Sequence, residues 1–348
     1  MSIKRKCHLA GAALTALALA LTGCSAAEDS ADEEYPAAGS DRESTDVESA
    51  DSASDGTGAT VTVESWRGPV DVPAPPERPA VTDNRAARIL DNWGIDVVAA
   101  PLDVFPADLS YRGDDSVANM GAHFEPNLEA LVAAQPDVVL NGYRFAELYD
   151  DIEAVVPDAT MVDISMDIVD NDPAGEFRKQ LDLLGAIFDK QAEADALYAD
   201  FEDAGERAAE AYDPEQTVMG LLTSGGNISY VAPVTGRSVG PLFSIIDMTP
   251  ALEQEGDDNT HGDDISVEAI AQADPDWIIV LDRDAAVASD DDEDYRSARE
   301  LIADSEALQN VTAVKEDQII YLAEDFYLTE DIMAYTVALE RMAEAFAK

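Results

Sequence analysis

Apolar and polar positions change their period repeatedly along the chain. From Ala80 onward, short apolar runs such as 97–100 and 160–164 alternate with segments such as 85–93, in which apolar residues recur every three or four positions. Runs of the first kind predict buried strands, and segments of the second kind predict amphipathic helices. This alternation is typical of α/β folds, in which helices cover a mainly parallel sheet.

The longest helical pattern lies in the middle of the chain, between Pro173 and Tyr212, with no proline inside it. Strand and helix patterns resume from Val218 and end in an amphipathic helix over about 331–346. We therefore predict an α/β protein with two Rossmann-like α/β lobes joined by one long interdomain helix. The predicted boundaries are 61–171 for the N-terminal lobe, 172–213 for the linking helix and 214–348 for the C-terminal lobe.

The two halves share an internal repeat. Residues 129–140 align with 268–279 at a constant separation of 139 positions, which also relates Arg144 to Arg283. In each half a helical pattern ends before Pro-Asp, an apolar strand follows, and the arginine stands just beyond the strand. Ligands of open α/β sheets bind at that edge. The repeat therefore predicts two arginines facing a common cleft, although either one alone would suggest a surface ion pair.

The first residues have the features of a bacterial export signal. Basic residues at 4–6 precede an uncharged run over 9–21 that is too short for an ordinary membrane span. The run ends in Leu-Thr-Gly-Cys, which resembles the lipobox of lipoproteins; the alternative is an ordinary signal peptide with a chance cysteine. We predict a signal peptide over 1–23, a lipidated (palmitate-type) Cys24 and an acidic flexible tether over 24–60. The protein would then be extracytoplasmic and held at the bacterial cell membrane by lipid alone.

Charge narrows the range of partners. The 348 residues include 73 Asp and Glu against 21 Lys and Arg, a formal net charge of -52. Nucleic acids and anionic membrane surfaces are bound through Lys and Arg, so we predict neither as a direct partner. With 46% apolar residues the chain can still form a core, unlike a disordered acidic tail. The acidity itself indicates solubility or a saline habitat.

Motifs of the common enzyme classes are missing from the sequence. It contains no Gly-x-Ser-x-Gly elbow, no P-loop and no His-Glu-x-x-His. The carboxylates at 290–294 lack the spacing of a calcium loop. We therefore predict a binding protein and not an enzyme, with no intrinsic cofactor.

Six short segments carry a family resemblance: 72–78, 124–130 (Phe-Glu-Pro-Asn-Leu-Glu-Ala), 136–139, 260–268 (Thr-His-Gly-Asp-Asp-Ile-Ser-Val-Glu), 275–286 and 319–322. The first three look like the N-terminal lobe of ABC-transporter substrate-binding proteins for iron siderophores. The others resemble more specifically the ferric-catecholate branch, the petrobactin- and enterobactin-type binding proteins. The resemblance implies a class III periplasmic-binding-protein fold with small hinge motion. It also implies a monomeric receptor that captures a ferric siderophore and delivers it to the permease of an ABC importer.

The resemblance also implies which residues hold the ligand. Arg144, Arg237 and Arg283 match three positions from which catecholate-binding members direct arginine at the ligand, and Tyr143 adjoins the first of them. Guanidinium suits an anionic iron complex because it stays protonated and offers a fork of donors to paired oxygens. The carboxylates flanking Arg283 could neutralise it, but strand alternation predicts that Asp282 and Asp284 point away.

Where the siderophore leaves two iron positions open, the resemblance implies that His261 and Tyr327 fill them. A phenolate oxygen is a hard donor for Fe(III), and imidazole is an acceptable one. The sequence departs from the family here, because Thr329, Glu330 and Asp331 replace a Gly/Ser-rich continuation; a core or cleft-wall role for Tyr327 therefore stays open. His123 either lines the opposite rim of the cleft or is an exposed loop histidine.

Glu129 and Glu268, matched by the repeat, correspond to the family's acidic positions that dock on the permease, one from each lobe. The alternative is that both are ordinary surface carboxylates. Related proteins also carry haem, cobalamin or hydroxamate siderophores, so these ligands remain alternatives to a catecholate. An acidic surface adhesin or receptor without a transport role is the alternative from another class.

Overall fold

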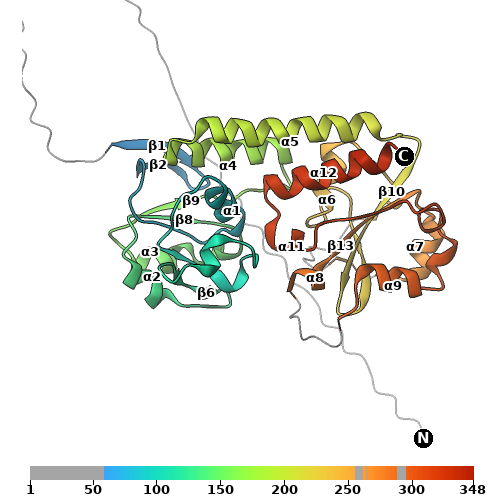
Figure 1. The fold of residues 1–348 in the computed structure, drawn as a ribbon, viewed down its shortest axis with the longest axis horizontal. Coiled ribbons are helices and arrows are strands. Elements are labelled where there is room, and N and C mark those ends of the chain that lie inside the picture. The colour runs from blue at the N-terminus through green and yellow to red at the C-terminus, as the bar shows by residue number, and fades with distance from the viewer. Residues whose placement is uncertain (1–58, 255–261, 264, 288–294) are drawn as a thin grey trace, which may run out of the picture. The chain divides into compact units, whose positions relative to one another are not determined.

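The computed structural model describes residues 59–254, 262–263, 265–287 and 295–348 (Figure 1). The predicted signal peptide, Cys24 and nearly all of the tether lie outside these residues, and so does His261. No helix in the described part of the chain is long and apolar enough to cross a membrane.

A five-stranded parallel sheet in the order β5-β4-β3-β8-β9 forms the centre of the N-terminal lobe, residues 59–163. Its strands β3 and β8 are wholly buried, which explains why they are apolar along their whole length. The strands are β1 (Thr60–Ser65), β2 (Gly68–Pro73), β3 (Pro79–Val81), β4 (Ala99–Ala100), β5 (Ala118–Asn119), β6 (Gly121–Ala122), β7 (Glu125–Pro126), β8 (Val138–Asn141) and β9 (Thr160–Asp163). The helices are α1 (Asn84–Asn92), α2 (Leu128–Ala134) and α3 (Tyr149–Val155), with 3-10 turns η1 (Leu102–Val104), η2 (Ser110–Gly113) and η3 (Tyr143–Leu148).

The C-terminal lobe, residues 217–348, contains a second sheet in the order β11-β10-β13-β14, with β12 also paired to β10. Only β11 runs antiparallel, because it forms a hairpin with β10. The strands are β10 (Thr217–Ser224), β11 (Asn227–Val231), β12 (Thr249–Pro250), β13 (Trp277–Asp282) and β14 (Ile319–Tyr321). The helices are α6 (Gly240–Ile245), α7 (Val267–Ala273), α8 (Arg283–Val287), α9 (Ala298–Asp304), η4 (Leu308–Asn310), α10 (Thr312–Lys315), α11 (Phe326–Thr329) and α12 (Ile332–Phe346).

The internal repeat appears in the structure residue by residue. Helices α2 and α7 start at Leu128 and Val267, and strands β8 and β13 start at Val138 and Trp277, so both pairs differ by 139 positions. Each helix ends on a residue in the left-handed region, at φ of 48° and 47°. The two halves therefore share one helix-strand unit, and the arginine that follows each strand has an equivalent place at the edge of its sheet.

The connection between the lobes consists of two helices, α4 (Pro173–Phe188) and α5 (Gln191–Ala211). One long helix, α5, does run past both lobes as predicted, with α4 and α12 packed beneath it (Figure 1). The single helix expected over 172–213 is wrong in extent, because Asp189 adopts the left-handed conformation and ends α4. The chain then reverses, so that the rings of Phe177 and Phe201 meet at 5.4 Å.

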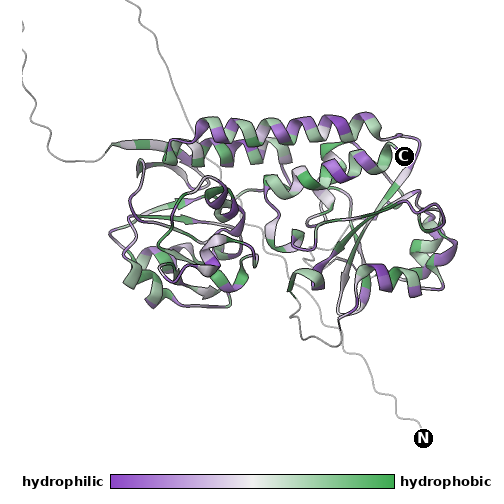
Figure 2. Ribbon diagram, in the orientation of Figure 1, coloured by the Kyte–Doolittle hydropathy of each residue, from purple (hydrophilic) through white to green (hydrophobic). Residues whose placement is uncertain are grey.

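Helix α5 is amphipathic and packs against α4 and α12. Hydrophilic and hydrophobic residues alternate along it, as expected for a helix with one exposed and one buried face (Figure 2). Phe177 lies between Phe201 of α5 and Tyr335 of α12, 5.2 Å from the latter ring. The helical layer thus joins the connection to the closing helix of the C-terminal lobe.

We expect Phe177→Ala to destabilise the protein strongly. The side chain is 1% exposed and contacts two aromatic rings, so its removal leaves a cavity that costs about 3–5 kcal/mol. Urea unfolding followed by circular dichroism measures the change in the free energy of unfolding. The matched control is Phe124→Ala, because Phe124 is 85% exposed and its loss should change stability by less than about 0.5 kcal/mol. Equal effects of the two substitutions would contradict the packing described for this layer.

Candidate functional site

The repeated strands β8 and β13 deliver two arginines to the carboxyl edges of the two sheets. Arg144 lies in η3, three residues after the end of β8, and Arg283 begins α8 directly after β13. The turn before Arg144 requires Gly142, because a Cβ atom there would lie 2.8 Å from Asp83 Oδ2. Both arginines therefore lie at the sheet edges where ligands of open α/β sheets bind, and we call the space between these two edges the crevice.

Three arginines surround one tyrosine. The guanidinium carbons of Arg144, Arg237 and Arg283 lie 5.2, 4.4 and 5.1 Å from the ring centroid of Tyr327. Arg237 also donates to the Tyr327 hydroxyl at 3.4 Å, and Arg144 donates to the Tyr327 carbonyl at 3.3 Å. We call these four residues the arginine cluster. The structure thus brings together all three arginines singled out in the sequence, two of them from the C-terminal lobe and one from the N-terminal lobe.

The arginine cluster changes the acidity of its central phenol. Burial acts to raise the pKa of Tyr327, but the positive charges of Arg237, Arg144 and Arg283 outweigh it and hold the pKa below the ordinary tyrosine value. A phenol with a lowered pKa forms the phenolate, the form that binds a cation, at a lower pH. Tyr327 is only 4% exposed, so it is both a wall of the site and a potential donor within it.

Two guanidinium nitrogens of the cluster have no acceptor. Arg144 Nε and Arg283 Nε are buried and make no hydrogen bond to any described residue. Buried donors without partners are rare and cost free energy. An anionic ligand with several oxygens in this crevice would supply the missing acceptors.

Glu330 lies at the centre of the polar contacts beside the arginine cluster, a place that its sequence position did not predict. Its carboxylate is paired with Arg237 at 2.8 Å and accepts hydrogen bonds from Tyr143 and Ser238. Burial acts to raise the pKa of Glu330, yet Arg237 and the two hydroxyl donors hold it below the ordinary glutamate value. The signal in the sequence was the replacement of the Gly/Ser-rich continuation by Thr-Glu-Asp at 329–331.

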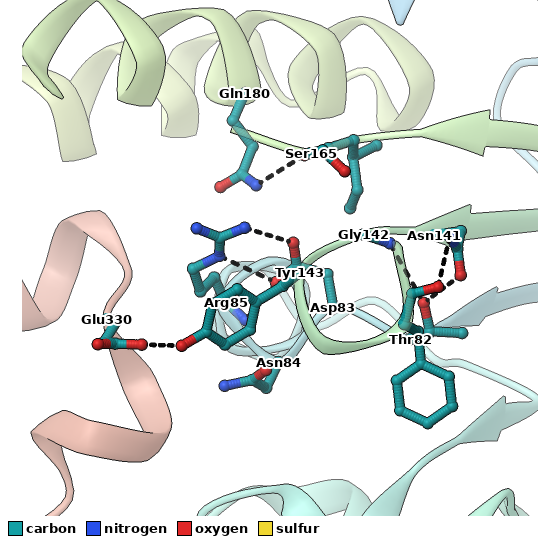
Figure 3. A network of polar contacts seen from close by, with 12 residues as sticks. Thr82, Asp83, Asn84, Arg85, Asn141, Gly142, Tyr143, Ser165, Gln180 and Glu330 are labelled. Carbon is teal, nitrogen blue, oxygen red and sulfur yellow. Dashed lines mark hydrogen bonds and ion pairs between the residues drawn. The ribbon is translucent and has the colours of Figure 1, made fainter. Parts of the chain in front are cut away.

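Tyr143 links the arginine cluster to a second, buried ion pair. Figure 3 shows its ring between Glu330 and Arg85, whose guanidinium carbon lies 4.2 Å from the ring centroid. Arg85 is itself paired with Asp83 at 3.1 Å. Burial and the charge of Glu330 raise the pKa of Tyr143. This tyrosine therefore keeps its proton and donates a hydrogen bond to the carboxylate. The pKa values of Tyr143 and Tyr327 are therefore shifted in opposite directions.

The expectation that both carboxylates flanking Arg283 point away is wrong for one of them. Asp284 accepts a hydrogen bond from Arg283 at 3.2 Å, whereas Asp282 turns away to Tyr295 and the backbone of Ala298. Strand alternation does not apply to Asp284, because β13 ends at Asp282 and a helix begins. Asp284 therefore offsets part of the charge of Arg283.

His123 lies beside the arginine cluster. Its ring is 3.8 Å from that of Phe124, and burial together with the charges of Arg144 and Arg237 lowers its pKa. The lowered pKa favours the neutral imidazole, and a place for His123 on the rim of the site stays a prediction. Among the described residues, no group of three or more His, Cys, Asp or Glu side chains could hold a metal ion. His261 lies outside the described residues.

A cavity of about 440 Å³ adjoins the polar contacts of Glu330. It lies between residues of the two lobes, and Trp66, Met166 and Pro241 give it an apolar side. Its polar side includes Arg85, Tyr143, Arg237 and Glu330. Its volume is within the usual range for sites that bind small molecules.

Two α/β lobes with a long connecting helix and a cationic crevice at facing sheet edges define a two-lobed solute-binding protein. Residues 80–326 match the periplasmic binding protein family, and the chain belongs to that family.

Two relatives and a further solved structure illustrate the match. The petrobactin-binding protein YclQ of Bacillus subtilis is 26% identical over 260 residues, covering 72% of this chain and 76% of YclQ. The ferric-anguibactin-binding protein FatB of Vibrio anguillarum is 27% identical over 213 residues, covering 61% of this chain and 65% of FatB. The crystal structures of YclQ and of the catecholate-siderophore-binding protein VctP of Vibrio cholerae superpose with TM-scores of 0.71 and 0.70, at 23% and 22% identity. Each covers 83% of this chain and 99% of the other, and this likeness establishes the fold.

We expect Tyr327 to titrate before the other tyrosines when the pH is raised. The surrounding guanidinium groups stabilise its phenolate, so phenolate absorbance near 295 nm should begin to rise at a lower pH in the wild type than in Tyr327→Phe. Tyr321→Phe is the matched control, because burial raises the pKa of Tyr321 and its loss should leave the onset unchanged. An onset that is the same in the wild type and Tyr327→Phe would show that burial, and not the arginine cluster, controls this phenol.

Proposed function

We propose that this protein is the receptor of an ABC importer that captures a ferric siderophore of catecholate type and delivers it to the permease. The observation that carries the proposal is the arginine cluster, with three guanidinium groups and two buried donors that lack an acceptor. The names of the relatives, which bind petrobactin and ferric anguibactin, support the same ligand class.

Charge explains why an acidic protein would hold such a ligand. A ferric catecholate is a compact anion with hard oxygen atoms, and the formal charge of the whole chain is -52. Only a local concentration of fixed positive charge overcomes that background, and guanidinium groups provide it without losing their protons. The arginine cluster combines this charge with the aromatic ring of Tyr327, which suits flat catechol rings.

Iron that arrives with two open coordination positions would be completed by the protein. We propose Tyr327 and His261 as these ligands. The lowered pKa of Tyr327 supports its part, since coordination requires the phenolate. Tyr143 belongs to the same crevice, but it holds Glu330 and keeps its proton, so it contributes shape and hydrogen bonding instead of an iron bond.

The remaining parts of the proposal concern delivery. Cys24 would carry the lipid anchor, and the tether would let the lobes work close to the membrane. Glu129 and Glu268 would dock on the permease: each is the second residue of its helix, α2 or α7, and each is exposed. Their equivalent places in the two lobes suit a permease with two similar receptor-facing surfaces.

Binding of a ligand panel tests the receptor function. We expect quenching of intrinsic fluorescence by ferric bis-catecholate or tris-catecholate, with weaker binding of ferric hydroxamate, haem and cobalamin. Replacing any one of Arg144, Arg237 or Arg283 by Gln should weaken catecholate binding about 10- to 100-fold, the effect of losing a hydrogen bond between charged groups. The matched control is Arg207→Gln on α5, because Arg207 pairs with Asp203 and Glu340 and with no residue of the arginine cluster. Tight binding of haem or cobalamin alone, or unchanged catecholate affinity in all three variants, would overturn the proposal.

Transport tests the docking surface separately from ligand binding. In cells that lack their own copy of the gene, the double variant Glu129→Gln, Glu268→Gln should reduce uptake of the ferric siderophore at least about tenfold while its affinity in solution stays unchanged, because two ion pairs with the permease are lost. Glu206→Gln, an exposed carboxylate on α5, is the control. Normal uptake by the double variant would show that these residues are ordinary surface carboxylates.

A further inference from the structure

We infer that Glu330 is a specificity-determining residue, which offsets Arg237 and thereby selects ferric catecholate complexes of low negative charge over the trianionic ferric tris-catecholate. The inference rests on the proposed function. It concerns which member of the ligand class the crevice accepts.

Positive and negative charges in the crevice largely cancel. Three guanidinium charges, on Arg144, Arg237 and Arg283, surround the ring of Tyr327. Two carboxylates contact them directly: Glu330 pairs with Arg237 at 2.8 Å, and Asp284 pairs with Arg283 at 3.2 Å. Arg144 makes no ion pair with a described carboxylate. One positive charge is therefore left uncompensated while the Tyr327 phenol keeps its proton, which matches a complex with one net negative charge better than one with three. Ionisation of Tyr327 on binding iron would cancel this charge and disfavour a trianion further.

The carboxylates of Glu330 and Asp284 differ in how strongly they would act on an anion in the crevice. The side chain of Asp284 is 20% exposed, so water and salt screen its field. The side chain of Glu330 is 5% exposed, and its charge is felt in a medium of lower effective dielectric constant. Glu330 is therefore the carboxylate that a ligand in the crevice senses most.

The side chain of Glu330 is fixed in place. Hydrogen bonds from Ser238 and Tyr143 hold its oxygens in addition to Arg237, and its backbone has a φ of 45°. The next residue, Asp331, caps α12 and is paired with Arg88 of the N-terminal lobe at 2.8 Å. Because these contacts hold both the side chain of Glu330 and the backbone next to it, the carboxylate would stay in the crevice when an anion enters.

The identity of the ligand class follows from coordination chemistry. Fe(III) bound by two catecholates has a net charge of minus one and two open positions, whereas three catecholates give a charge of minus three and no open position. Ti(IV) with three catecholates has the same shell as the ferric tris-complex but a charge of minus two. These three complexes separate the effect of charge from the effect of shape.

The experiment compares the affinities of the wild type and Glu330→Gln for these three complexes by quenching of tryptophan fluorescence. Trp66 lines the cavity next to Glu330 and serves as a nearby reporter. Gln keeps the size and an accepting oxygen but removes the charge. The gain in affinity on substitution should grow with ligand charge, and the gain for the ferric tris-complex should exceed that for the bis-complex by at least about tenfold. A gain that is equal for all three, or no gain, overturns the inference.

Two further variants separate charge from structure. Ser238→Ala removes a hydrogen bond to Glu330 but keeps its charge, so the order of the three affinities should not change. The double variant Arg237→Gln, Glu330→Gln removes one charge of each sign, so the order of its affinities for the three complexes should be that of the wild type. This variant leaves no buried charge unpaired, so it keeps the test possible if Glu330→Gln alone fails to fold. A double variant that instead favours the trianion would also overturn the inference. Failure of the wild type to bind any catecholate complex, in contrast, would overturn the proposed function itself.

Discussion

The buried ion pair between Arg237 and Glu330 is the interaction on which the site depends. Breaking a buried pair by removing one partner is costly, because the other charge is left without compensation. The pair also positions two neighbouring groups. Arg237 lies 4.4 Å from the centre of the Tyr327 ring, and Glu330 accepts a hydrogen bond from Tyr143. Burial and Glu330 together raise the pKa of Tyr143, whereas Arg237, with Arg144 and Arg283, lowers the pKa of Tyr327 against the effect of burial.

The same short segment also connects the lobes. Residues 327–331 of the C-terminal lobe receive hydrogen bonds from Asn84, Arg144 and Tyr143 and an ion pair from Arg88, all of which belong to the N-terminal lobe. Tyr327 and Glu330 therefore belong both to the contacts between the lobes and to the site proposed for the ligand. This arrangement, next to the helical layer of α4, α5 and α12, favours local adjustment of the crevice over wide separation of the lobes.

Much of this structure could be predicted from the sequence, and what was missed has physical reasons. The repeat located Arg144 and Arg283 because equivalent strands end at equivalent edges, and periodicity located the two α/β halves. The helix reversal at Asp189 was missed because an aspartate in the left-handed region leaves no break in the apolar pattern. The role of Glu330 was missed because its partners Arg237 and Tyr143 are 93 and 187 positions away, and no local pattern predicts such contacts.

The contrast between surface and buried charge explains how one residue can matter in so acidic a chain. Exposed carboxylates act through water, and their fields fade within about 8–10 Å at ordinary salt concentrations. Most of the 73 acidic residues therefore have little effect on an anion in the crevice, although they exclude large polyanions. Glu330 acts through protein instead of water, next to the guanidinium groups that would bind the ligand. The net charge of the whole chain therefore predicts which macromolecules are excluded, whereas the balance of a few buried groups determines which small anion is accepted.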